Sequence, residues 1–89
     1  MRPNMGIKLR YFAWVRERVG RGEETVEPPE TVTTIAELVT WLKTQGAEYE
    51  AAFAEAAAVR AAIDMHHVEP TAAIAPGAEV AFFPPVTGG

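Results

Sequence analysis

The N-terminal part of the chain alternates apolar and polar side chains, which is the two-residue period of a strand with one buried face. In residues 7–12, Ile7, Leu9 and Tyr11 share one face, and Phe12 falls on the other. The pattern predicts a first strand that packs its odd-numbered side chains into the core.

A short helix and a second strand are predicted next, at residues 13–19 and 24–27. Gly20 and Gly22 end the helix, and Pro28 ends the strand because it cannot donate to a sheet ladder. The first and second strands are expected to pair as a hairpin.

The clearest helix signal begins at Thr34, which forms a capping-box pattern with Glu37. The apolar positions that follow with helical spacing are Ile35, Leu38, Val39 and Leu42. Gly46 stands at the usual C-terminal position of such a helix. These features predict an amphipathic helix that packs one apolar stripe on a sheet.

The second half of the chain predicts a weaker helix and three further strands. Residues 47–58 are rich in Ala and Glu, and only Tyr49 and Phe53 offer apolar surface there. The strands are predicted at residues 59–63, 65–69 and 79–83, with a turn at Pro76-Gly77. This order of elements predicts an α+β fold in which a mixed sheet packs on one main helix, the layout of ubiquitin.

The composition limits the class of protein. The 89 residues are enough for one domain, and nearly half of them are apolar, as in a folded globular protein. A net charge of -4 argues against nucleic-acid binding, which needs clustered Lys and Arg. No window reaches the roughly 20 apolar residues of a membrane span, so we expect no membrane contact and a cytoplasmic location. Residues 1–5 are expected to be a disordered extension, in which Met5 is an alternative start to Met1.

The side chains offer little catalytic chemistry of their own. The chain has no cysteine, which excludes disulfides, thiolate metal sites and cysteine nucleophiles. His66 and His67 would point to opposite faces of a strand, so they could not share a metal ion, and we expect no metal site. The acidic residues Glu23, Glu24, Glu27 and Glu30 are interpreted as a solvated face.

The last six residues, 84–89, have the sequence Pro-Pro-Val-Thr-Gly-Gly and carry no charged side chain. The prolines favour an extended segment, and terminal glycines can enter a channel too narrow for larger residues. A frayed terminus is the plain alternative. We favour a reactive tail, in which ATP activates the C-terminal carboxylate as an anhydride with AMP. A sulfur nucleophile would then replace AMP and leave a thiocarboxylate.

The ending Phe82-Phe83-Pro84-Pro85-Val86-Thr87-Gly88-Gly89, preceded by residues 77–81, resembles that of molybdopterin synthase small subunits. These subunits belong to the MoaD/ThiS group of β-grasp sulfur carriers. The runs Tyr11-Phe12-Ala13 and Val15-Arg16-Glu17, followed by Gly20, are similar to the first strand and helix of that family. The resemblance covers nearly the whole chain, from residue 5 to residue 89.

The resemblance implies a β-grasp (ubiquitin-like) domain at residues 6–83, a tail at residues 84–89, and Gly89, supported by Gly88, as the reactive end. It also implies two partners: an E1-like adenylating enzyme with its own ATP and zinc, and the large catalytic subunit of molybdopterin synthase in a heterotetramer. The chain itself would bind no cofactor. The expected partner contacts are Phe12, Arg16, His67, Phe83, Pro84, Pro85, Val86 and Thr87. His67 departs from the apolar residue that the family has there.

Three alternatives stay open. The chain could carry sulfur for the thiamine thiazole ring or another thiolated product, or be joined through Gly89 to lysines as a protein modifier. It could also be a binding module whose tail has no chemistry. The resemblance does not decide between molybdenum and tungsten as the eventual metal.

Overall fold

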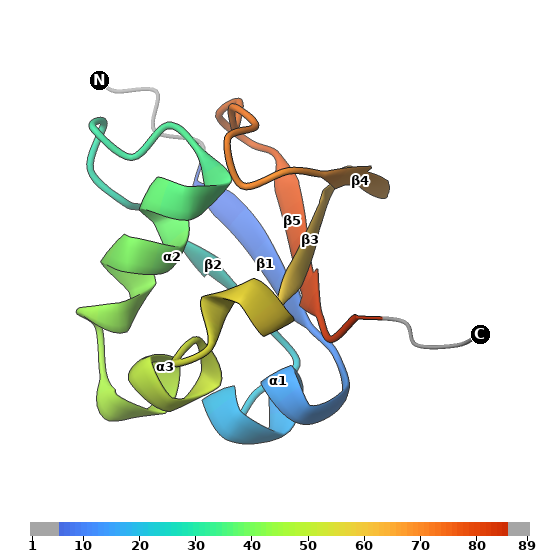
Figure 1. The fold of residues 1–89 in the computed structure, drawn as a ribbon. Helices are drawn as coiled ribbons and strands as arrows, with labels where there is room; N and C mark the ends of the chain where they lie inside the picture. The colour runs from blue at the N-terminus through green and yellow to red at the C-terminus, as the bar shows by residue number, and fades with distance from the viewer. Residues whose placement is uncertain (1–5, 86–89) are drawn as a thin grey trace.

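The computed structural model describes residues 6–85. The extension predicted at residues 1–5 and the last four residues, 86–89, lie outside the described residues. Figure 1 shows a mixed sheet with α2 and α3 on one side of it. The strands are β1 (Ile7–Tyr11), β2 (Glu23–Val26), β3 (Arg60–Ile63), β4 (His66–Val68) and β5 (Glu79–Phe83). The helices are α1 (Ala13–Val19), α2 (Ile35–Lys43), α3 (Ala47–Ala52) and a 3₁₀ turn, Ala56–Ala58.

The sheet has the order β2-β1-β5-β3-β4, with β1 and β5 parallel and the other neighbours antiparallel. This is the β-grasp arrangement that the sequence predicts. The predicted pairing of the first two strands is confirmed, with Ile7 opposite Val26. The chain between them is the helix α1, so their connection is longer than a hairpin turn.

The core lies between the sheet and the helices. Its sheet side is formed by the alternating residues of β1 and β5, which confirms the predicted period. The aromatic ring of Phe82 is stacked with Tyr11 at 6.2 Å and meets the edge of Phe53 at 5.0 Å. Aromatic pairs of this kind contribute about 0.5–1.5 kcal/mol beyond the area they bury. Through these contacts, β1 and β5 pack against Phe53 at the end of α3.

The capping box of α2 is present, but the prediction for the end of this helix is wrong. Thr34 Oγ1 accepts from the N–H of Glu37 at 3.2 Å, and Glu37 Oε1 accepts from the N–H of Thr34. The helix ends at Lys43, where the backbone tightens into i→i−3 bonds, from Thr44 to Trp41 at 3.0 Å and from Gln45 to Leu42 at 2.8 Å. The hydroxyl of Thr44 also donates to the carbonyl of Trp41, at 2.6 Å. Gly46 is the N-cap of α3 instead.

The helix predicted at residues 47–58 is shorter and interrupted. Tyr49 and Phe53 are both buried, at 6% and 0% exposure, and they anchor one turn of α3. Beyond Phe53 there is no further large apolar side chain to hold a longer helix, and the chain passes through turns into Ala56–Ala58. Helical stability comes mainly from packing of an apolar face, so the Ala-rich composition alone does not extend the helix.

The strands β3 and β4 form a hairpin whose two turn residues, Asp64 and Met65, both have positive φ, of 49° and 74°. Met65 is 90% exposed at its tip. The outer strand β4 is shorter than the predicted 65–69.

Among residues 6–85 no helix combines the length and the hydropathy that crossing a bilayer requires.

Candidate functional site

Phe12 and Phe83 lie at the same end of two neighbouring parallel strands, where the chain leaves the sheet. In the register of β1 and β5, Tyr11 is opposite Phe82, and the N–H of Phe12 donates to the carbonyl of Phe82 at 3.1 Å. Since Tyr11 and Phe82 face the core, the residues that follow them are directed to the other side of the sheet. Phe12 is 44% exposed and Phe83 is partly exposed.

His67 reaches the same surface from β4. Its ring centroid lies 5.1 Å from that of Phe83, and its side chain is exposed. The structure therefore brings together three of the predicted contact residues, Phe12, His67 and Phe83, which we call the aromatic face. His67 packs its ring on Phe83 as an apolar residue would. Its role toward a partner stays a prediction.

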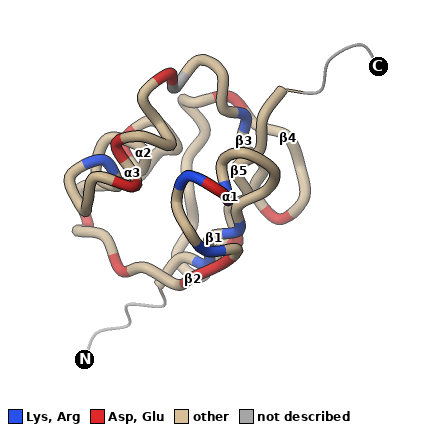
Figure 2. Tube along the Cα trace, turned by 90° about the horizontal axis from the view of Figure 1, so that it is seen from below, with Lys and Arg blue, Asp and Glu red and all other residues tan. Residues whose placement is uncertain are grey.

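Arginine side chains lie beside the aromatic face. The guanidinium of Arg10 is 5.9 Å from the centre of the Phe12 ring, and it pairs with Glu79 at 3.2 Å and Glu23 at 3.9 Å. Arg60 is opposite Phe83 in the register of β3 and β5, and it has no ion-pair partner among the described residues. Figure 2 shows basic residues along β1 and α1 as blue segments. The aromatic face is thus flanked by cationic groups.

The tail begins directly after Phe83. Pro84 and Pro85 are partly buried, and neither has an N–H that could continue the ladder of β5. The predicted contact residues Val86 and Thr87 and the predicted reactive pair Gly88 and Gly89 lie outside the described residues. What the structure places is the root of the tail, next to the aromatic face.

Arg16 lies on α1, one turn after Phe12, and its N–H donates to the carbonyl of Phe12 at 3.3 Å. Its side chain lies against the backbone of Gly22, where an added Cβ would stand 3.3 Å from Arg16 Nε. The guanidinium is therefore directed along the loop between α1 and β2. Its predicted contact with a partner stays a prediction.

The structure corrects the interpretation of Glu24 as part of a solvated face. One carboxylate oxygen, Oε2, accepts from the hydroxyl of Tyr11 at 2.7 Å and from that of Tyr49 at 2.5 Å. Arg21 donates to the Tyr49 hydroxyl and pairs with Glu24 Oε1 at 3.5 Å. We call these four residues the tyrosine clasp. Only Glu23, Glu27 and Glu30 are exposed as expected.

The clasp has a clear electrostatic signature. Burial, and then the hydrogen bond to Glu24, raise the pKa of Tyr49 to about 12, and the same causes raise the pKa of Tyr11. One feature of the sequence indicates this network: a tyrosine on the buried face of a strand needs a partner for its hydroxyl. Glu24 is the nearest acceptor on the paired strand, opposite Leu9.

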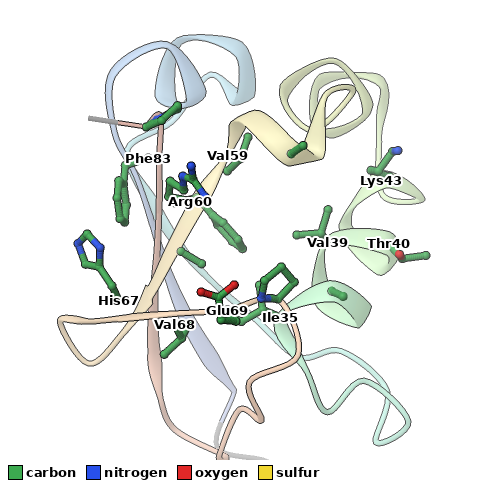
Figure 3. Close-up of a pocket in the computed structure, with 16 residues that line it drawn as sticks. Ile35, Val39, Thr40, Lys43, Val59, Arg60, His67, Val68, Glu69 and Phe83 are labelled. Atoms are coloured by element: carbon green, nitrogen blue, oxygen red, sulfur yellow. The ribbon is translucent and has the colours of Figure 1, made fainter. Parts of the chain in front are cut away.

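A second feature that the sequence did not reveal is a groove of about 800 Å³ between α2 and the β3–β4 hairpin (Figure 3). Val39, Thr40 and Lys43 of α2 form one wall, and Arg60, His67 and Phe83 lie on the opposite side. The groove thus extends from α2 to the aromatic face. It arises from elements far apart in the sequence, so no local pattern indicates it.

Within the described residues, no three His, Cys, Asp or Glu side chains are close enough to hold a metal ion together. The imidazole Nδ1 of His66 is 3.1 Å from the carbonyl of Asp64, whereas the ring of His67 packs on Phe83. The two histidines have separate partners, as the alternation of β4 requires.

The chain belongs to the ThiS family, whose model matches residues 9–89. Fold and family together make it a small β-grasp protein of the type that includes sulfur carriers and ubiquitin-like modifiers. A search of curated proteins found no significant match.

Solved structures share the fold over nearly the whole chain. A candidate molybdopterin converting factor, subunit 1, from Pyrococcus furiosus has 28% identity and a TM-score of 0.75, covering 92% of this chain and 99% of its own. The HVO 2177 protein of Haloferax volcanii has 25% identity and a TM-score of 0.74, covering 96% and 87%. SAMP1 of Haloferax volcanii has 20% identity and a TM-score of 0.71, covering 94% and 99%. At this identity, the likeness to SAMP1 concerns the fold alone.

Proposed function

We propose that this chain is the sulfur-carrier subunit of a molybdopterin synthase. Its own part in the reaction is to present a C-terminal thiocarboxylate, and the catalytic residues belong to the large subunit. The observation that carries the proposal is that the family match includes the Gly88-Gly89 ending, so the tail is part of what the chain shares with ThiS proteins. The likeness to the Pyrococcus furiosus protein supports the molybdopterin branch.

The proposed chemistry takes place in two steps on Gly89. A carboxylate oxygen attacks the α-phosphorus of ATP on an E1-like adenylating enzyme, and pyrophosphate leaves. A hydrosulfide equivalent then attacks the acyl carbon, AMP leaves, and the thiocarboxylate remains. Inside the large subunit this sulfur would be donated to precursor Z (cyclic pyranopterin monophosphate) to build the molybdopterin dithiolene. Because the activation consumes ATP, we expect the protein to act in the cytoplasm.

The described geometry supports presentation of the tail. Phe12 and Phe83 stand at the root of the tail with exposed apolar surface, and such aromatic residues often dominate the energy of protein interfaces. Pro84 and Pro85 restrict the backbone of the following segment, which lowers the entropy lost when the tail enters a partner. A partner that grips the aromatic face thereby aligns the tail with its own active site.

The test is an intact-mass measurement. The untagged chain is incubated with ATP, a sulfur donor and the candidate adenylating enzyme. We expect a mass increase equal to the difference between sulfur and oxygen, located at Gly89 and missing from a variant that lacks this residue. An unchanged mass with an enzyme of proven activity on another carrier would contradict the proposal. Adding precursor Z and the large subunit then tests the acceptor, because only the molybdopterin branch predicts a dithiolene product.

The nearest rival is a sulfur carrier for another product, such as the thiamine thiazole ring, which the acceptor test separates from the molybdopterin branch. A rival of a different class is a ubiquitin-like protein modifier, with SAMP1 as a protein that shares the fold. A modifier would form an amide between Gly89 and a lysine of a target protein. Detection of such conjugates in cells, dependent on Gly89 and present without the large subunit, would favour the modifier.

A further inference from the structure

In the groove between α2 and the β3–β4 hairpin, part of the outer edge of β3 is not paired with another strand. The strand β4 pairs with β3 from Ala61 to Ile63, with Ala61 opposite Val68. Before Ala61, the outer side of β3 has no strand beside it and faces the groove. An open strand edge offers backbone hydrogen bonds to another chain.

The direction of the free backbone groups follows from the register. Asp64, next to β3, donates its N–H to Glu79 of β5 at 2.8 Å, so the even-numbered residues bond toward β5 and the odd-numbered residues bond toward the outer side. Val59 continues the odd-numbered series. Its C=O has no hydrogen-bond partner among the described residues, whereas its N–H closes the 3₁₀ turn Ala56–Ala58.

Pro70 explains why the hairpin does not supply a hydrogen-bond donor to the carbonyl of Val59. With Ala61 opposite Val68, the residue that would stand opposite Val59 is Pro70, which has no N–H to donate. The carbonyl of Pro70 already accepts from the N–H of Ala36 at 2.9 Å. The carbonyl of Val59 is thus left as a hydrogen-bond acceptor that residues 6–85 do not fill.

The side chains around this position select an occupant. Val39, Val59 and Val68 give the groove an apolar lining. Lys43, Arg60 and Glu69 also line it, and none of the three has an ion-pair partner among the described residues. The two cations outnumber the one carboxylate, so the groove is basic although the whole chain has a net charge of -4. They fit a ligand that carries carboxylates on both sides of an apolar centre.

We propose that this groove binds an extended, acidic segment of a partner protein, which adds as a short strand beside Val59. Its apolar side chain would lie on the valines, and its carboxylates would pair with Lys43 and Arg60. The residues after Pro85 are a poorer occupant, because they offer one carboxylate, that of Gly89, and not one on each side of an apolar centre. Their two glycines are also costly to order. The inference goes beyond the proposed sulfur transfer and does not depend on it.

The experiment titrates the ¹⁵N-labelled full chain with the peptide acetyl-Asp-Val-Ile-Val-Asp-amide and follows the backbone amides by NMR. We expect saturable shifts centred on Val39, Lys43, Val59 and Arg60. The peptide with Lys in place of both Asp residues is the ligand control and should leave these amides in place. The variant Lys43→Glu/Arg60→Glu should bind the acidic peptide roughly tenfold more weakly or worse. The charge control Lys8→Glu, on the exposed side of β1, should stay within about twofold of the parent chain.

Four outcomes would overturn the proposal. The first is no saturable shift up to about 1 mM peptide, near the weak limit of specific binding. The second is a set of shifts confined to β2 or to Phe12, away from the groove. The third is movement of the groove amides when residues 86–89 are deleted, which would make the tail the occupant. The fourth is movement of these amides on dilution, which would make a second copy the occupant. Because no sulfur chemistry is involved, failure here leaves the mass test of Gly89 unaffected.

Discussion

The tyrosine clasp gives the sharpest test of how this small domain is held together. In the variant Glu24→Ala, the hydroxyls of Tyr11 and Tyr49 lose their shared acceptor. Both tyrosines are buried, with 1% and 6% exposure, so water cannot easily replace the carboxylate. Each buried polar group left unsatisfied costs about 1–3 kcal/mol. We therefore expect the free energy of unfolding to fall by about 3 kcal/mol, out of a total of roughly 5–15 kcal/mol for a domain.

The matched control is the neighbouring residue on β2. Glu23 forms a 3.9 Å ion pair with Arg10 in which both side chains are about half exposed or more. Exposed pairs contribute about 0.2–1 kcal/mol, so Glu23→Ala should change stability by no more than that. Urea unfolding followed by the fluorescence of Trp14 and Trp41 measures both variants under the same conditions.

A second background separates the hydroxyl contacts from other effects of the mutation. In the chain with Tyr11→Phe and Tyr49→Phe, no hydroxyl is left to satisfy, so adding Glu24→Ala should cost less than half of what it costs in the parent chain. The reasoning is refuted if Glu24→Ala is no more destabilising than Glu23→Ala. It is also refuted if the cost of Glu24→Ala is the same in both backgrounds.

Three further predictions concern the hairpin tip, alkaline pH and the aromatic face. Met65→Gly should raise the free energy of unfolding by about 0.5–1 kcal/mol, because glycine adopts the φ of 74° without strain; an unchanged or lower melting temperature would contradict this. Tyr49 has a pKa of about 12 in the fold against 10.0 as its ordinary value, so its contribution is intact below pH 10 and is lost as the pH rises toward 12; thermal unfolding from pH 9 to pH 12 should show a steeper loss in the parent chain than in Tyr49→Phe. Phe83→Asp should fold normally by circular dichroism and weaken binding of the large subunit roughly tenfold or more. The control Phe82→Asp, at a buried position, should unfold the chain. Equal binding by Phe83→Asp and the parent chain would show that the aromatic face is not part of the interface.

The local rules of sequence predicted a large part of the fold. The bounds of α1 and β5 agree with the predicted residues 13–19 and 79–83. The capping box at Thr34 and the buried positions of β1 also follow from the sequence. These features depend on neighbours a few residues apart, such as a hydroxyl facing an N–H one turn later, or the strict alternation of a strand. They are therefore encoded within a short window.

The wrong predictions concern competition between local signals and distant contacts. Gly46 looked like a helix end, but α2 ends earlier, at Lys43, in a tighter turn of i→i−3 bonds. The Ala-rich run at residues 47–58 has good helix propensity, yet only Tyr49 and Phe53 anchor it to the core. Glu24 looked like a surface acid because the sequence does not show that Tyr49 of α3 comes to the same place as β2.

For the candidate site, the sequence by itself determined which residues are available for binding and chemistry. These are the tail of prolines and glycines after an aromatic strand, and Phe12, which lies on the opposite face from the buried residues of its strand. Only the tertiary structure decided their arrangement. The parallel pairing of β1 and β5 sets Phe12 beside Phe83, and the hairpin brings His67 onto the same surface. The missing N–H of Pro70 leaves Val59 open beside α2. Periodicity indicates the face on which a side chain lies, whereas contacts between residues about 70 positions apart depend on how the strands pair, which is decided by the packing of the whole core.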